Sequence, residues 1–218
     1  MIGRYDAVLF DLLTALVDSG ALWNRIAANN TDGGRWRAAY LRLTYSLGRY
    51  RAYETVVAEA AEAVGLPRSL VDDLTAGYDT LEPWPEAPNV LQTLGSALPL
   101  GIVTNCSERL GRIAAERTGG EFAIIVTAER AGFYKPDPRP YQLALDALRT
   151  TAERCLFVAG SPYDLFGTSK LGLPTYWHDR TGTTPPPGTP PPLWHEKTLS
   201  PMLELEGLAN NTEVRQVS

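Results

Sequence analysis

The chain of 218 residues has a formal net charge of −5 and a hydrophobic fraction of 44%, which indicates a folded globular protein rather than a disordered one. Acidic and basic residues are mixed along the sequence, so we expect neither a nucleic acid nor an anionic membrane as a partner, because both require a basic face. The two cysteines, Cys106 and Cys155, lack the spacing of a metal site and are too few for a disulfide framework.

The N-terminal segment, MIGRYDAVLF, carries charges within its apolar stretch and has no small-residue cleavage site, so we do not expect a signal peptide. No apolar run in the sequence approaches the length of a membrane-spanning helix. These features favour a cytoplasmic protein. Residues 5–11 are the first predicted strand, because a short apolar run of this kind suits a buried parallel sheet.

Helical periodicity follows from about residue 19 to residue 80, in a stretch rich in Ala, Leu, Arg and Tyr. We expect two or more helices there, broken at Gly48 and at the Gly-Leu-Pro of residues 65–67. The proline-rich residues 81–89 indicate a hinge.

Beyond the hinge, strands and helices alternate. The expected strands are residues 98–105, 122–128, 154–161 and 174–180, and the expected helices are residues 107–119 and 138–150. Residues 180–192 are of low complexity and predict a loop without helix or strand. This alternation predicts the α/β class, with a doubly wound, Rossmann-like parallel sheet covered by helices on both faces.

The first strand is separated from the rest of the predicted sheet by the helical stretch, which indicates an insertion. We expect a core formed by residues 1–17 and 84–209, with a helical cap domain over residues 18–83. Residues 210–218 are expected to be a frayed C-terminal tail.

Ligands of open parallel sheets bind beyond the carboxyl ends of the strands, so the polar residues there are the candidates for a site. Asp11 follows the first strand, Thr104 and Asn105 end the second, and Ser161 and Asp164 follow the strand at 154–161. An aspartate in this place can act as a nucleophile that forms an ester or acyl-phosphate. Structural alternatives are a turn cap for Asp11, a helix N-cap for Thr104 and Asn105, and a first-turn helix acid for Asp164.

Lys135 stands in the segment FYKPDPRPY, where the neighbouring prolines restrict the backbone. Its ammonium group could hold and orient an anionic nucleophile, with Asp164 either holding the lysine or helping to activate water. The alternative is a surface lysine in a turn.

Four stretches occur in the order FDLLTALVDS, GIVTNCS, YKPDP and FVAGSPYD, and this set resembles the motifs of the haloacid dehalogenase superfamily. Within it, the sequence is most similar to the L-2-haloacid dehalogenases. The stretch RWRAAYLRLTY places Arg37 on the arginine that binds the substrate carboxylate in that family, and Tyr141 follows Lys135 by six residues as a tyrosine does there. Without the resemblance, Arg37 would be interpreted as an ordinary arginine of an amphipathic helix.

Two positions distinguish this sequence from the phosphatases of the superfamily. The resemblance places Leu13 where phosphatases carry a proton-donating aspartate, and Gly160 where they carry a magnesium-ligating aspartate. Because Mg²⁺ usually takes carboxylate ligands, we expect no metal and no cofactor. Dehalogenases usually have Tyr, Gly and Thr at positions 13–15 and Ser-Ser-Asn at 159–161, so the sequence departs from their pattern as well.

The resemblance therefore implies a metal-independent hydrolase that removes halide from a small 2-halo carboxylic acid through an ester intermediate. Asp11 would be the nucleophile, and Lys135 and Asp164 would assist water. The predicted substrate-binding residues are Arg37, Thr104, Asn105, Tyr141, Leu13 and Ser161. Two alternatives stay open: a magnesium-dependent phosphatase of the same superfamily, and a catalytically degenerate member that binds a metabolite or partner.

The expected partner is thus a small anionic substrate of the 2-halo acid class, and a homodimer is compatible with the resemblance. The aromatic residues Tyr40, Tyr45, Tyr50 and Tyr53 are expected in a core or at a dimer surface.

Overall fold

Six parallel strands form a single sheet within the part of the chain that the structure, a computed structural model, describes, namely residues 4–205 and 208. The strand order is β3-β2-β1-β4-β5-β6. The strands are β1 (Ala7–Phe10), β2 (Leu100–Thr104), β3 (Ile124–Thr127), β4 (Cys155–Ala159), β5 (Thr175–His178) and β6 (Trp194–Glu196). The predicted α/β class with a parallel sheet is confirmed, whereas the tail predicted at 210–218 lies outside the described residues.

The helices of the described residues fall into two groups along the chain. The first group is α1 (Ser19–Ile26), α2 (Asn30–Leu47), α3 (Tyr53–Ala63), α4 (Leu70–Ala76) and the 3₁₀ helix η1 (Gly77–Thr80). The second is α5 (Ala87–Gly95), α6 (Glu108–Glu116), α7 (Ala128–Ala131), α8 (Pro138–Leu148), α9 (Asp164–Leu171) and the 3₁₀ helices η2 (Ala152–Arg154) and η3 (Ser200–Glu204).

Local sequence explains where the first helices begin and end. The side chains of Asp18 and Asn29 accept hydrogen bonds from the first turns of α1 and α2, as N-cap residues do. Gly48 ends α2 with a positive φ of 65°, which glycine adopts without strain. The predicted breaks at Gly48 and at residues 65–67 are confirmed.

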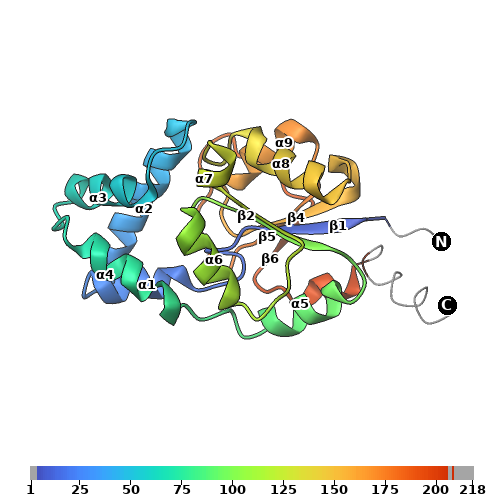
Figure 1. Cartoon of the computed structure of the whole chain (residues 1–218), viewed down its shortest axis with the longest axis horizontal. Coiled ribbons are helices and arrows are strands. Elements are labelled where there is room, and N and C mark those ends of the chain that lie inside the picture. The colour runs from blue at the N-terminus through green and yellow to red at the C-terminus, as the bar shows by residue number, and fades with distance from the viewer. Residues whose placement is uncertain (1–3, 206–207, 209–218) are drawn as a thin grey trace.

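The central strand β1 separates two hydrophobic cores. Its side chains alternate, so that Val8 and Phe10 join one cluster of buried residues while Ala7 and Leu9 join the other. Helices α7, α8 and α9 cover one face of the sheet, and α5 and α6 cover the opposite face (Figure 1). This double covering explains why all four residues of β1 are buried.

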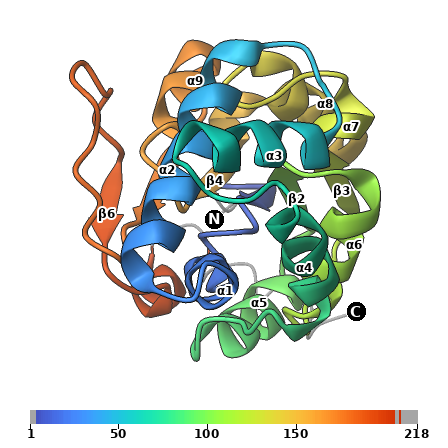
Figure 2. The ribbon, with the colours of Figure 1, turned by 90° about the vertical axis from the view of Figure 1, so that its left-hand side faces the viewer.

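The helices of the insertion, α1–α4, lie together beyond the carboxyl ends of the strands (Figures 1 and 2). The chain enters and leaves them at one place, because Val17 forms an antiparallel bridge with Pro83 and the N–H of Asp18 donates to Glu82 O at 2.9 Å. The boundaries at 17/18 and 83/84 stay a prediction.

One strand was not predicted. Strand β6 pairs in parallel with β5, with Tyr176 opposite Trp194. It is only three residues long and follows the proline-rich segment, so no periodicity reveals it. The predicted loop over residues 180–192 is confirmed, and it projects beside β6 (Figure 2).

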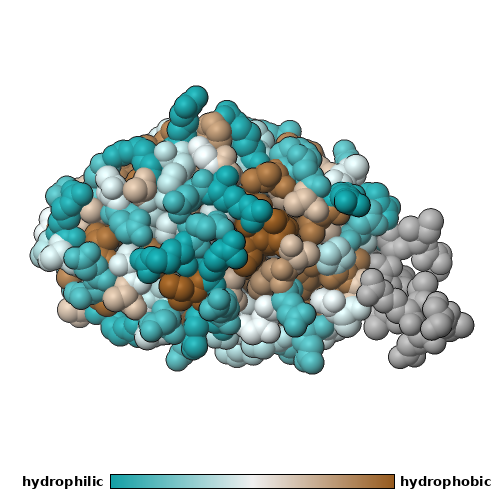
Figure 3. Space-filling model, in the orientation of Figure 1, coloured by the Kyte–Doolittle hydropathy of each residue, from teal (hydrophilic) through white to brown (hydrophobic). Residues whose placement is uncertain are grey.

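The surface is mostly hydrophilic on the face shown in Figure 3, with a hydrophobic patch over the β3 edge of the sheet, between the two helix layers. No helix in residues 4–205 is both long enough and apolar enough to cross a membrane.

Candidate active site

Asp11 lies immediately beyond β1 and is 7% exposed. Its backbone N–H donates to Val158 O at 2.8 Å, which continues the pairing between β1 and β4. The N–H groups of Thr14 and Ala15 donate to Asp11 Oδ2 at 3.2 and 3.3 Å. Oδ2 therefore caps the turn that follows β1, which is the structural role that the sequence also allowed for Asp11. Oδ1 takes no part in this turn.

Lys135 links two carboxylates. Its Nζ lies 2.7 Å from Asp11 Oδ1 and 2.9 Å from Asp164 Oδ1. Lys135 belongs to the loop that connects α7 and α8, and its side chain is buried, so the alternative of a surface lysine is wrong. Burial by itself disfavours the ammonium form, but the two carboxylates outweigh it and raise the pKa of Lys135 above its ordinary value. The group is therefore a permanent cation against the candidate nucleophile.

Asp164 is the first residue of α9 and is almost fully buried. Burial raises the pKa of its carboxyl group to about 6, with Lys135 opposing and Asp11 adding to that shift. The hydroxyl of Tyr141 donates to Asp164 Oδ1 at 2.7 Å. A carboxyl group with this pKa can exchange a proton with water near neutral pH.

Asn105 and Tyr141, both predicted to bind substrate, form hydrogen bonds to the charged residues of the site. The N–H of Lys135 donates to Asn105 Oδ1 at 2.7 Å, and Asn105 Nδ2 donates to Lys135 O at 3.0 Å. Tyr141 points from α8 toward β4, where its ring packs 5.1 Å from that of Phe157, and it is not among the residues that line the cavity beside Asp11. A substrate contact of either residue stays a prediction.

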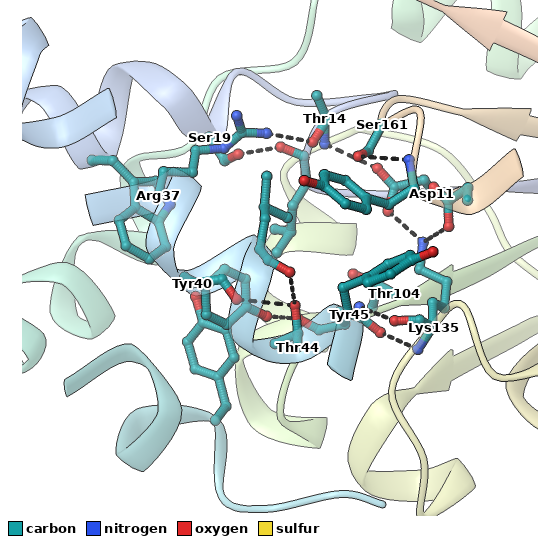
Figure 4. Close-up of a pocket in the computed structure, with 17 residues that line it drawn as sticks. Asp11, Thr14, Ser19, Arg37, Tyr40, Thr44, Tyr45, Thr104, Lys135 and Ser161 are labelled. Carbon is teal, nitrogen blue, oxygen red and sulfur yellow. Dashed lines mark hydrogen bonds and ion pairs between the residues drawn. The ribbon is translucent and has the colours of Figure 1, made fainter. Parts of the chain in front are cut away.

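A small cavity of about 50 Å³ lies beside Asp11 and Lys135 (Figure 4). The predicted residues that line it are Asp11, Leu13, Arg37, Thr104, Asn105, Lys135, Ser161 and Asp164. The hydroxyl of Thr104 is buried there without a hydrogen-bond partner among the described residues, so a polar atom of a bound molecule could satisfy it. The N-cap alternative for Thr104 and Asn105 is wrong, because Ser107 caps α6.

Arg37 reaches the cavity from α2. Its Nη2 donates to Thr14 Oγ1 at 2.9 Å, as Figure 4 shows. Burial lowers the pKa of Arg37, although Asp11 and Asp18 act in the opposite direction, and an arginine stays charged in any case. Within residues 4–205 and 208 the guanidinium forms no ion pair with a carboxylate. A half-buried cation with one hydroxyl partner and several free donors is suited to bind an anion.

Other residues of the cavity wall were not predicted as site residues. They are Thr14, Ser19, Trp23, Tyr40, Leu41, Thr44, Tyr45, Tyr53 and Tyr163. The spacing of Arg37, Leu41 and Thr44 places them on one face of α2, and this signal was present in the sequence. Tyr40 also joins the insertion to the sheet, because its hydroxyl donates to Asn105 O at 2.7 Å.

The sequence profile of the haloacid dehalogenase-like hydrolases matches residues 5–168. The chain belongs to this family. Haloacetate dehalogenase H-2 of Moraxella sp. (strain B) is 26% identical over 196 residues, which cover 82% of this chain and 88% of that protein. The (S)-2-haloacid dehalogenase of Pseudomonas sp. (strain YL) is 27% identical over 215 residues, covering 91% and 93%.

The fold of this haloacid dehalogenase-like hydrolase also matches solved structures. The L-2-haloacid dehalogenase of Xanthobacter autotrophicus, with chloropropionic acid covalently bound, superposes with a TM-score of 0.80 over 98% of this chain and 100% of that one, at 19% identity. At that identity the likeness concerns the fold alone.

Gly160 packs against the turn that follows Asp11 in this hydrolase. A Cβ atom at this position would lie 2.2 Å from Ala15 N and 2.5 Å from Thr14 C, and backbone atoms cannot yield as a flexible side chain can. The turn that holds Asp11 therefore fills the space into which a side chain at position 160 would extend. No aspartate fits there unless this turn moves.

We expect Gly160→Ala to lower the free energy of unfolding by about 1–3 kcal/mol, because its methyl group would push against the Asp11 turn. Urea denaturation followed by circular dichroism measures the change. Gly34→Ala is the matched control: no atom lies within 4 Å of its added Cβ, and alanine favours the helix, so stability should rise by up to about 1 kcal/mol. A Gly160→Ala protein as stable as wild type would contradict the close contact.

Proposed function

We propose that the protein is a metal-independent hydrolase that removes halide from a small 2-halo carboxylic acid through an ester on Asp11. One observation carries the proposal: Asp11 is paired with Lys135 on one side of the cavity, while Arg37 reaches the same cavity without a carboxylate partner among the described residues. The first pair provides an oriented anionic nucleophile, and the free cation provides a place for the carboxylate of a substrate. The dehalogenase relatives support this choice of substrate.

In the first step, a carboxylate oxygen of Asp11 forms a bond to C2 of the substrate as the carbon–halogen bond breaks and halide leaves with the electron pair. Halide needs no proton to leave, so the reaction does not require a proton-donating side chain at position 13, where this chain has Leu13. Arg37 and the free hydroxyl of Thr104 would bind the substrate carboxylate or the departing halide.

In the second step, water attacks the carbonyl carbon of the Asp11 ester, which releases the 2-hydroxy acid and restores the carboxylate. Asp164 would take one proton of that water, because the pKa of its buried carboxyl group is raised to about 6, and return it to the alkoxide oxygen of the departing hydroxy acid, while the second proton of the water is released as Asp11 returns to its carboxylate form. Lys135 would stabilise the negative charge that develops on the ester, since its Nζ already lies 2.7 Å from Asp11 Oδ1.

Magnesium-assisted phosphoryl transfer is the weaker alternative. Leu13 offers no side-chain proton donor, and the backbone of Thr14 and Ala15 occupies the space that a carboxylate at position 160 would need. The carboxylates of Asp11 and Asp164 are already engaged by Lys135. These residues therefore do not offer the set of oxygen ligands that Mg²⁺ prefers.

Halide release from each enantiomer of 2-chloropropionate tests the proposal directly. We expect turnover of one enantiomer with equal rates in the presence of EDTA and of added Mg²⁺. Hydrolysis of p-nitrophenyl phosphate with Mg²⁺ is the comparison for the phosphatase alternative. Phosphatase activity without halide release from any of several 2-halo acids would overturn the proposal. The cytoplasmic location and the homodimer stay predictions of the sequence.

A further inference from the structure

The four consecutive carbonyl groups of residues 13–16 all accept hydrogen bonds from side chains or backbone outside this segment. Ser19 Oγ donates to Leu13 O, and Trp84 Nε1 donates to Thr14 O at 2.8 Å. His178 Nδ1 lies 2.9 Å from Ala15 O and must carry the proton, because a carbonyl only accepts. The backbone N–H of Trp84 donates to Leu16 O at 2.9 Å.

The Thr14–Ala15 peptide connects one of these donors to the nucleophile. Its carbonyl oxygen accepts the indole N–H of Trp84, and its N–H donates to Asp11 Oδ2 at 3.3 Å. Because a peptide unit is planar, with its C=O and N–H pointing in opposite directions, a donor that fixes the oxygen also fixes the aim of the N–H. The bond from Trp84 also polarises the peptide and strengthens the donation to Asp11.

Trp84 is itself held firmly. Pro83 and Pro85 flank it in the chain and restrict the backbone, and its own N–H is bonded to Leu16 O. The guanidinium of Arg180 lies 4.9 Å from the centre of the indole, on its face. The ring of His178 meets the indole edge-on, with centroids 6.2 Å apart. The indole therefore has a defined orientation at the point where the chain returns from the inserted helices.

We propose that Trp84 is a positioning residue for the nucleophile: its indole N–H fixes the Thr14–Ala15 peptide and, through it, the orientation of the Asp11 carboxylate. His178 holds the next peptide of the same turn, whose N–H, that of Leu16, donates to Leu12 O at 3.1 Å. Neither side chain touches the cavity, so both act through the backbone. The kinetic consequence rests on the proposed function, whereas the structural consequence does not.

The test uses Trp84→Phe, which removes the indole N–H together with the five-membered ring and keeps a six-membered aromatic ring and the backbone bond to Leu16. We expect the amide hydrogens of Thr14 and Ala15 to exchange about fivefold faster, as the loss of one hydrogen bond predicts, measured residue by residue by NMR or fragmentation mass spectrometry. We expect kcat for halide release to fall about tenfold with KM changed by less than about twofold, because Arg37 and the cavity wall stay in place.

Trp36→Phe is the matched control, because Trp36 Nε1 donates to Val57 O at 2.9 Å wholly within the inserted helices. It loses the same kind of bond and should leave exchange at Thr14 and Ala15 unchanged. Unchanged exchange in Trp84→Phe, equal acceleration in both variants, or faster exchange with an unaltered kcat would each overturn the proposal. If the wild type released no halide, the proposed function would fail, and the exchange data alone would still decide whether Trp84 fixes this turn.

Discussion

Replacing Asp11 with asparagine is expected to lower the rate of halide release by at least about 1,000-fold. The change is almost isosteric, and the single amide oxygen can still accept hydrogen bonds either from Thr14 and Ala15 or from Lys135. An amide oxygen, however, is a far weaker nucleophile than a carboxylate and forms no stable ester. The loss should therefore appear in kcat rather than in the fold.

Peptide mass spectrometry after a single turnover provides a second measurement. Wild-type protein mixed with 2-chloropropionate and quenched in acid should gain the mass of the esterified acid on the peptide that contains Asp11, and Asp11→Asn should gain nothing. Asp146→Asn makes the same chemical change on the exposed surface of α8 and should behave as wild type. Full activity in Asp11→Asn would exclude the proposed nucleophile.

The second large effect is expected for Lys135→Met, which keeps most of the volume of the side chain and removes its charge. Asp11 and Asp164 would then face each other as buried carboxylates without a cation between them. Breaking a buried ion pair by removing one partner costs about 3–5 kcal/mol of folding free energy, and we expect a loss of this size at pH 8 together with loss of halide release.

The pH dependence of Lys135→Met has a defined sign. Without the ammonium group, the pKa of Asp164, already raised to about 6 by burial, should rise further. The folded variant then binds more protons than the unfolded chain above about pH 4, so its stability falls as the pH rises through that higher pKa. Urea denaturation at pH 5 and pH 8 should show the smaller deficit at pH 5.

Arg68→Met is the matched control, because it removes the cation of an ion pair, with Glu62, in which both side chains are exposed. Its loss should cost about 1 kcal/mol or less. If Lys135→Met were as stable as wild type at pH 8, the two carboxylates could not both be ionised in the native protein, and the proposed charges of the site would be wrong.

The general position of the site could be predicted from the sequence, because carboxyl ends of parallel strands meet at one edge of the sheet. That rule places Asp11, Thr104 and Asp164 close together without any knowledge of side-chain conformation. The placement of Lys135 beside them required the resemblance as well, since its turn has no periodic pattern.

The roles of Asn105 and Tyr141 could not be predicted in the same way. Both lie near the cavity, but their side chains turn to the backbone of Lys135 and to the carboxylate of Asp164. Which neighbour a side chain selects depends on rotamers and on the competition between buried polar groups, and strand order does not contain this information. The same limit applies to Trp84, which the sequence shows only as part of a proline-rich hinge.

The chain enters the inserted helices at Val17 and leaves them at Pro83, and these two residues lie side by side. The gene therefore encodes the inserted helices in one continuous stretch. The codons for Asp11, Lys135 and Asp164 lie outside the stretch that encodes α1–α4, whereas the codon for Arg37 lies within it. Under the proposed function, recombination or repeated mutation of that one stretch can alter the contact to the substrate carboxylate while the proposed nucleophile and its two partners are inherited unchanged. Substrate range can diversify faster than reaction chemistry in a protein connected in this way.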